Sequence, residues 1–265
     1  MKITKHVSKG FSLVEVVIAI GIVAILLTTF MAVFGPAQQN INRAIGVSDA
    51  NRLVSTLENE MAVLRLGEEN EYQDADGNAS AFEKAFQWIQ NSNGAGDAIL
   101  IYQYQALPDE SNQDGTLQAI EASDAQDENL LPGKDYITQT TARRVSFDPY
   151  GLIEKELVPG VVSGNVYVAR MTQLLLQADK DDIDDDGDRT ELVLQVGDAG
   201  KIKFINEDGT ETEVGDSSDY NEAYITVQVE FFQMPNNLAG YVTGGGWDFD
   251  ELGSPVAVHN IAVRR

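Results

Sequence analysis

The chain has 265 residues, 43% of them hydrophobic and 8% aromatic, which is the composition of a folded protein with material for a sizeable core. Its 42 acidic and 18 basic residues give a formal net charge of −24, which disfavours binding to a nucleic-acid backbone. The absence of cysteine excludes disulfides, thiolate metal sites and cysteine nucleophiles.

A short basic leader precedes a long apolar run at the amino terminus. The leader, residues 1–10, contains Lys2, Lys5 and Lys9 and no acidic residue. The run from Phe11 to Phe34 is apolar except for Ser12, Glu15, Thr28 and Thr29. A helix needs about 20 such residues to cross the hydrocarbon core of a bilayer, whereas the apolar part of a secretory signal is shorter. We therefore predict a single-pass membrane protein with a cytoplasmic amino terminus and an acidic head outside, as the positive-inside rule requires.

The junction between leader and run reads Lys-Gly-Phe-Ser-Leu-Val-Glu-Val, residues 9–16. A basic leader that ends in glycine, a following phenylalanine and a glutamate five residues into the mature chain resemble the prepilin signal of type IV pilins and type II secretion pseudopilins. The resemblance covers about the first 65 residues. It implies that a prepilin peptidase cleaves between Gly10 and Phe11 and methylates the new amino group of Phe11.

Glu15 is the feature of the apolar run that most needs an explanation, because a carboxylate in hydrocarbon costs several kcal/mol. Cleavage after Gly10 creates a cationic amine at Phe11, one helical turn from Glu15, so the two groups can pair within one subunit or between neighbours. The resemblance implies the intersubunit pair, which sets the register of a growing filament. The alternative is that Glu15 lies at the membrane interface beside the helix amino terminus and has no further role.

One long helix is predicted to continue into the head. Gly35-Pro36 predicts an interruption as the chain leaves the membrane, and the absence of an earlier proline favours the pseudopilin side of the family. Beyond it, apolar residues recur at helical spacing, with Gly67 as the C-cap: Ala50, Leu53, Val54, Leu57, Met61 and Leu64. We predict four parts: leader 1–10, transmembrane helix 11–35, soluble helix 36–67 and head 68–265.

The head is predicted to be α+β, with an antiparallel sheet packed on the long helix. Ser80 and Glu83 have capping-box spacing, so a helix begins there and presents Phe82, Ala85, Phe86 and Ile89 on one face. The predicted strands are 98–107, 144–147, 165–176, 191–196, 201–205, 210–214, 223–233 and 256–263, with an acidic loop at 108–135. We expect 191–196 to pair with 201–205, and 206–209 to form a hairpin turn.

An acidic segment within the head resembles half of a calcium loop. Asp182, Asp184, Asp186 and Asp188 alternate around Gly187, but Val193 stands where an EF-hand needs its bidentate glutamate, and Glu191 comes two residues early. Some pseudopilins bind calcium, so the resemblance adds support to a looser Ca²⁺ site closed by Glu191. A solvated acidic turn remains an equal alternative. The shorter run from Asp74 to Asn78 is predicted to be a plain turn.

Catalytic motifs are absent from the sequence. The two histidines are His6, in the leader, and His259, which we predict to be a structural strand residue. No Ser-His-Asp order, H-E-x-x-H motif, P-loop or dinucleotide fingerprint occurs, so an enzyme is not expected.

These patterns predict a pilin-like structural subunit, a pseudopilin or minor pilin, of a type II secretion or type IV pilus-like filament. It would lie in the bacterial inner membrane with a periplasmic head before assembly. Its expected partners are prepilin peptidase, other pilin-like subunits and the inner-membrane assembly platform, and no nucleic acid. The competing hypothesis is a membrane-tethered calcium- or ligand-binding protein that does not polymerise.

Overall fold

The computed structural model describes residues 13–127, 129–178, 192–206 and 210–265. Of residues 31–48, 126, 176–178 and 192–193 it describes the backbone alone. The chain divides into two compact units, Met1–Ser48 and Asp49–Arg265. The four-part division made from the sequence stays a prediction.

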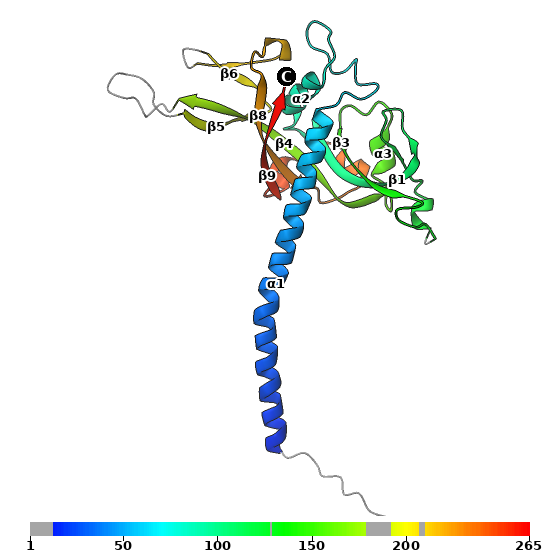
Figure 1. Cartoon of the computed structure of the whole chain (residues 1–265), viewed down its shortest axis with the longest axis vertical. Coiled ribbons are helices and arrows are strands. Elements are labelled where there is room, and N and C mark those ends of the chain that lie inside the picture. The colour runs from blue at the N-terminus through cyan, green and yellow to red at the C-terminus, as the bar shows by residue number, and fades with distance from the viewer. Residues whose placement is uncertain (1–12, 128, 179–191, 207–209) are drawn as a thin grey trace, which may run out of the picture. The chain divides into compact units, whose positions relative to one another are not determined.

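Helix α1 spans Leu13–Met61 and contributes to both units (Figure 1). The break predicted at Gly35-Pro36 is wrong, because α1 continues through both residues; a proline removes one backbone hydrogen bond, and the remaining bonds of a long helix can maintain it. The predicted C-cap is also wrong, since α1 ends six residues before Gly67. Gly67 has φ +91° and lies against the Tyr150 hydroxyl, which leaves no room for a side chain.

The end of α1 and helix α2, Ala81–Asn91, pack on one face of the sheet in the second unit. The predicted stripe of α1 is confirmed: Leu53, Leu57 and Met61 are buried there. Ser80 caps α2 by accepting a hydrogen bond from the Glu83 N–H at 3.0 Å, as the sequence predicts. The predicted apolar face of α2 is buried as well.

Seven strands form the main sheet, and every pairing between them is antiparallel. They are β1 Ile99–Ser111, β2 Leu117–Ala119, β3 Ile137–Arg144, β4 Val162–Ala178, β5 Leu192–Ala199, β8 Tyr224–Gln233 and β9 Ala257–Arg264. Their order is β2-β1-β4-β8-β9, with β3 paired to β1 and β5 paired to β4. A separate hairpin consists of β6, Lys203–Ile205, and β7, Glu211–Glu213. The predicted α+β class with an antiparallel sheet is therefore confirmed.

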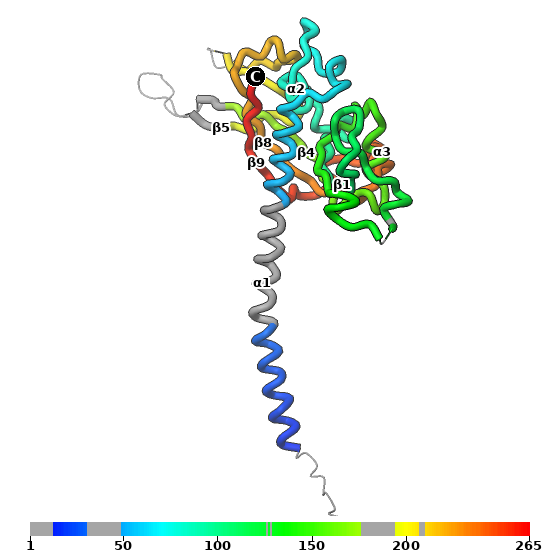
Figure 2. The backbone as a smooth tube through the Cα atoms, turned by 45° about the vertical axis from the view of Figure 1, so that its right-hand side comes forward, coloured from blue at the N-terminus to red at the C-terminus, as the bar shows by residue number. Residues whose placement is uncertain are grey.

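Both faces of the sheet are covered along β1 and the first half of β4. Ile99 and Ile101 belong to the core with α1 and α2, whereas Leu100 and Tyr102 join a second core with Trp247. Figure 2 traces the backbone of β1, β4 and the helices around them. The second core also takes residues from α3, Leu152–Glu156, and α4, Ala239–Val242. Four single-turn 3-10 helices, Ala95–Asp97, Asp124–Gln126, Ser217–Asp219 and Phe249–Glu251, complete the described elements. Burial on both faces explains why the start of β1 is uniformly apolar rather than alternating.

The sheet differs from the sequence prediction at three places. The strand predicted at 144–147 lies earlier, at Ile137–Arg144, because Arg143 and Arg144 are held in ion pairs that hid the strand pattern. The segment 108–135, predicted to be an acidic loop, contains the end of β1, which continues to Ser111, and the whole of β2. β5 pairs with β4 rather than with 201–205, and β6 pairs with β7 instead. Residues 207–209 of the predicted hairpin turn lie outside the described residues.

Candidate functional site

The first described part of α1, Leu13–Phe30, is long and apolar enough to cross a membrane. Its mean hydropathy is 2.6, and it would span about 27 Å at the α-helical rise. Its large side chains are exposed, among them Leu13 at 81% and Ile25 at 67%. An exposed apolar surface of this length needs lipid or another helix around it.

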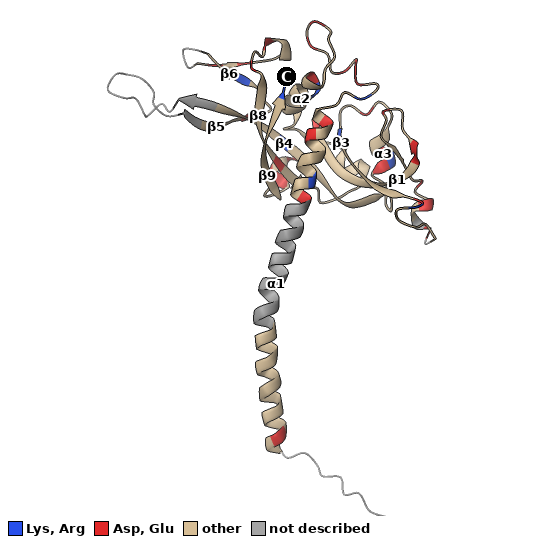
Figure 3. Cartoon of the chain, in the orientation of Figure 1, with Lys and Arg blue, Asp and Glu red and all other residues tan. Residues whose placement is uncertain are grey.

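Glu15 is the single charged residue of this stretch and lies in the first turn of α1 (Figure 3). Its side chain is exposed, and among the described residues it has no ion-pair partner. The unsatisfied N–H groups of a helix amino terminus carry partial positive charge, which favours a carboxylate at this position but does not neutralise it. The helix therefore presents one acid at the end of an apolar surface, which is the arrangement that a neighbouring cation would complete.

The two threonines near the end of this stretch satisfy their own hydroxyl groups. Thr28 Oγ1 donates to the Ala24 carbonyl at 3.0 Å and to the Ile25 carbonyl at 2.9 Å, and Thr29 Oγ1 donates to the Ile25 carbonyl at 2.8 Å. Because the hydroxyls bond within the helix, both side chains can enter hydrocarbon without leaving a donor unpaired. Glu15 is thus the one side chain here that requires an external partner.

Several predicted site residues lie outside the described residues. These are Gly10 and Phe11 at the cleavage junction, and Asp182, Asp184, Asp186, Asp188 and Glu191 of the predicted calcium loop. Within the part of the chain that the structure describes, no group of three or more His, Asp or Glu side chains is placed to hold a metal ion. The calcium hypothesis therefore stays a prediction.

The shorter acidic run forms a turn, as predicted. Asp74 Oδ1 accepts from the N–H groups of Asp76 at 3.0 Å and Asn78 at 2.7 Å. These backbone bonds, the Asn78 bond first, lower the pKa of Asp74. The Asp74 carboxylate is therefore already hydrogen-bonded within its own turn.

His259 lies in β9 opposite Val229, the strand position that the sequence predicts.

A buried ion cluster fastens the end of α1 to α2. Lys84 of α2 is fully buried, and its Nζ donates to Glu60 Oε1 at 2.9 Å, Glu68 Oε2 at 2.9 Å and the Val63 carbonyl at 3.2 Å. Arg65 donates to both oxygens of Glu60, at 2.7 and 2.6 Å. Burial by itself raises the pKa of Glu60, but the bonds and charges of Arg65 and Lys84 outweigh it and lower that pKa.

A second buried cluster ties β3 to α3. Arg143 donates to both oxygens of Glu156 at 2.7 Å and to Asp114 Oδ2 at 2.9 Å. The Tyr102 hydroxyl donates to Glu156 Oε2 at 2.6 Å. Burial is the main cause of the raised pKa of Glu156, although Arg143 opposes it. Because Arg143 and Tyr102 occupy both oxygens of Glu156, this buried carboxylate stabilises the fold and is not presented to a substrate.

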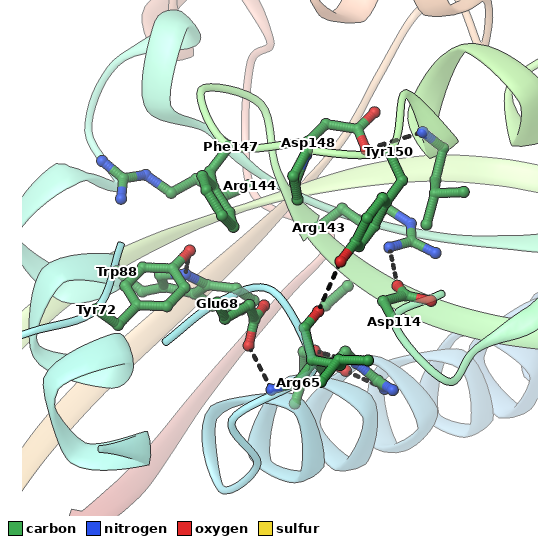
Figure 4. Close-up of a pocket in the computed structure, with 15 residues that line it drawn as sticks. Arg65, Glu68, Tyr72, Trp88, Asp114, Arg143, Arg144, Phe147, Asp148 and Tyr150 are labelled. Atoms are coloured by element: carbon green, nitrogen blue, oxygen red, sulfur yellow. Dashed lines mark hydrogen bonds and ion pairs between the residues drawn. The ribbon is translucent and has the colours of Figure 1, made fainter. Parts of the chain in front are cut away.

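Between the two clusters lies a cavity of about 30 Å³, which has room for one or two water molecules. Figure 4 shows Tyr150 on one side of it, with its hydroxyl directed at the Leu66 carbonyl, and Tyr72 and Trp88 on the other. The Trp88 Nε1–H donates to the Tyr72 oxygen at 2.9 Å, and burial raises the pKa of Tyr72 to about 12. A hollow of this size is far below that of a small-molecule site.

The sequence prediction missed both clusters, although a signal for the first was present. Glu60 occupies a position of the apolar stripe of α1, three residues after Leu57, and Lys84 stands one turn before Trp88 on the buried side of α2. A charge at a core position of each of two successive helices predicts a buried pair. Arg143 had no such signal, since its partners come from segments distant in the sequence.

Comparison with known proteins identifies the amino-terminal segment. Residues 5–31 match the model of the prokaryotic N-terminal methylation motif, the prepilin-type cleavage and methylation signal of type IV pilins and pseudopilins. The matched residues include Gly10, Phe11 and Glu15, so the predicted resemblance is confirmed for this segment. Proteins with this motif are processed by prepilin peptidase and join pilin-like subunits, and they are structural rather than catalytic.

The chain therefore carries the signal of a type IV pilin-like or pseudopilin subunit. No curated protein and no solved structure is significantly similar to it.

Proposed function

We propose that this protein is a structural subunit, a pseudopilin or minor pilin, of a type II secretion or type IV pilus-like filament. The unassembled subunit lies in the bacterial inner membrane through Leu13–Phe30, with its amino terminus in the cytoplasm and its head in the periplasm. Prepilin peptidase cleaves between Gly10 and Phe11 and methylates Phe11. An assembly platform and its ATPase then move the processed helix from the membrane into the filament.

One observation carries this proposal: the methylation motif at residues 5–31 coincides with an exposed apolar helix that has a single acid, Glu15, in its first turn. A plain membrane anchor needs no acid there, and the acid is costly in lipid unless it is paired. The Phe11 amine that cleavage creates is a cation at the membrane edge. In the filament, Glu15 of one subunit pairs with this amine of its neighbour, while the exposed apolar side chains pack helix against helix.

The buried ion cluster around Lys84 supports a firm connection between α1 and the head. Lys84 of α2 holds Glu60 at the end of α1, and Glu60 in turn accepts from Arg65. Lys84 is fully buried and has all its hydrogen-bond donors occupied. Breaking such a buried set leaves uncompensated charges and costs several kcal/mol. A pull on α1 during assembly is thereby transmitted to the head without unfolding the last turns of the helix.

Mass spectrometry of the native amino terminus tests the proposal. The expected mature protein begins with methylated Phe11. Gly10→Asp should block processing, because a side chain at Gly10 obstructs the extended backbone that enters the peptidase. Ser8→Asp is the matched control, since it adds the same charge two residues earlier and should be processed normally. A native protein that keeps Met1 in assembled filaments would refute the proposal.

Crosslinking separates a filament subunit from a membrane-tethered binding protein. The chain has no cysteine, so a single Val17→Cys or Leu27→Cys substitution gives one reactive position in the apolar helix. We expect crosslinks to other pilin-like subunits in cells that process the protein and none for the same cysteine combined with Gly10→Asp. Monomeric behaviour in both backgrounds would favour the tethered alternative.

The calcium hypothesis has its own test. If Asp182, Asp184, Asp186, Asp188 and Glu191 hold Ca²⁺, calorimetric titration of the full chain should show binding that Asp184→Asn weakens by about tenfold, since the site loses a charged ligand. Asp76→Asn, in the exposed turn at Asp74–Asn78, is the control and should leave binding unchanged. Absence of heat in the unmodified chain would leave the segment as a solvated acidic turn.

A further inference from the structure

The last strand of the sheet, β9, has one edge without a neighbour among the described strands. β9 pairs with β8 along Ala257–Arg264, and the sheet order ends there. Residues 257–263 include no Asp, Glu, Lys, Arg or proline, which are the usual protections of an exposed edge. An unprotected strand edge of this length is a template for another strand.

The register of β9 shows which backbone groups are available. The Arg265 N–H donates to the Ala223 carbonyl at 3.0 Å, which makes these two residues a hydrogen-bonded pair of the antiparallel ladder. Such pairs alternate, so His259, Ile261 and Val263 bond to β8. The N–H and C=O groups of the residues between them point to the open edge. These residues are Val258, Asn260, Ala262 and Arg264.

A groove of about 400 Å³ lies beside the second half of this edge. Its walls are the last turns of α1, the start of α2 and β9 itself, which Figures 1 and 2 show beside one another. The helical walls are apolar at Met61, Ala62 and Phe82 and polar at Glu58 and Asn59. Ile261 and Val263 form the strand wall. A strand added to β9 would direct every second side chain into this groove, which would hold a few residues of modest size.

The charge around β9 indicates the chemistry of the added strand. Residues 252–265 contain Arg264 and Arg265 and no acid, in a chain whose net charge is −24, and the groove lining includes one acid, Glu58 of α1. Arg264 is exposed at the end of the open edge. A second copy of this chain would bring its own large negative charge close to the first, whereas a short acidic segment of another protein meets local positive charge.

We propose that β9 and this groove form a strand-addition site for an extended segment of a different protein, with small apolar side chains on one face and acidic ones on the other. The segment pairs antiparallel to β9 through Val258, Asn260 and Ala262. Main-chain bonds supply the affinity, and the groove selects the apolar side chains. The site goes beyond filament assembly, because it lies wholly within Asp49–Arg265 and does not depend on the amino terminus.

The test uses the full chain in detergent micelles and the synthetic peptide acetyl-TVEVEVT-amide. Binding, followed by fluorescence anisotropy of the labelled peptide, should protect the amides of Val258, Asn260 and Ala262 from hydrogen exchange. Ala262→Pro removes an edge N–H without touching a bond to β8 and should weaken binding at least tenfold. Ala262→Val keeps that N–H and should bind as the parent does.

Two further binding measurements test the site even if the Ala262→Pro variant is poorly folded. Ala62→Trp fills the groove from the exposed helix side and leaves the backbone of β9 intact; it should also weaken binding at least tenfold. The basic peptide acetyl-TVKVKVT-amide should bind at least tenfold more weakly than the acidic one. Equal binding of the acidic peptide to all variants, or no binding at millimolar peptide, overturns the site. Dimerisation of the chain alone that Ala262→Pro abolishes overturns the choice of occupant in favour of a second copy.

Discussion

The two ends of α1 both carry apolar side chains and a glutamate, but these are exposed at one end and buried at the other. From Leu13 to Phe30 the apolar residues are exposed, and the one charge, Glu15, has no ion-pair partner among the described residues. From Asp49 to Met61 the apolar stripe is buried in the head, and Glu60 is paired with both Lys84 and Arg65. In the proposed filament the first end is completed by another molecule, whereas the second is completed within the chain.

This difference predicts which property a mutation at each end of α1 should change. A change at the buried end should alter the free energy of unfolding of the head, whereas a change at the exposed end should alter assembly and leave the head stable. The two tryptophans, Trp88 and Trp247, are both buried in the second unit, so their fluorescence reports the unfolding of the head alone.

The largest effect is expected for Lys84→Met. Removing the buried ammonium leaves Glu68 without its cation and Glu60 with Arg65 alone, which should lower the free energy of unfolding by roughly 3–5 kcal/mol. Urea unfolding of the full chain, followed by tryptophan fluorescence, measures it. Lys134→Met is the control, because Lys134 is 75% exposed and its pair with Asp135 should contribute less than about 1 kcal/mol. Equal losses in both variants would contradict a special role for the buried cluster.

A matched pair of leucines tests the two ends of α1 directly. Leu57 is fully buried, so Leu57→Ala should destabilise the head by about 3 kcal/mol in the same urea experiment. Leu27 is 59% exposed, so Leu27→Ala should leave head unfolding unchanged and reduce filament incorporation instead. If Leu27→Ala lowered the stability of the head, the division of α1 into two functions would be wrong.

The pH dependence of stability should depend on Glu60. Because its pKa is lowered in the folded state, its contribution is present above the ordinary glutamate pKa of about 4.3 and is lost as the pH falls through the folded value. Glu60→Gln should therefore cost about 2 kcal/mol at pH 7 and clearly less at pH 3. Glu156, whose pKa burial raises, acts in the opposite direction, but it is present in both proteins and cancels in the difference. A cost that is independent of pH would show that the carboxylate charge of Glu60 is not what stabilises the cluster.

The smallest effect in free energy is expected for Glu15→Ala, although its consequence for function is large. The variant should insert into the membrane normally, and its incorporation into filaments should fall about tenfold, which corresponds to about 1.4 kcal/mol per contact. Glu154→Ala, which removes an exposed acid of the head, is the control. Normal incorporation of Glu15→Ala, quantified by immunoblotting of sheared filaments, would argue against pairing between Glu15 and the Phe11 amine.

Local sequence patterns predicted the elements that depend on regular spacing or on contacts between residues close in the sequence. In β8 the side chains of Ile225, Val227 and Val229 alternate with polar neighbours and are fully buried, as the period of two requires. The N-cap at Ser80 was also predictable, because its hydrogen bond joins residues three apart. The partner of β5 was not, since pairing with β4 depends on contacts that no local pattern contains.

The amino acid order alone determined the prepilin-type signal, the apolar helix with its single acid, the α+β class and the buried stripe of α1, because each follows from spacing over a few turns or one strand. Tertiary structure decided which strands pair, how Arg143 gathers Glu156 and Asp114, and that β9 has an open edge beside a groove. Those features join residues that are distant in sequence. The interactions that stabilise them form only when the folded chain brings those residues into contact, so no local pattern predicts them.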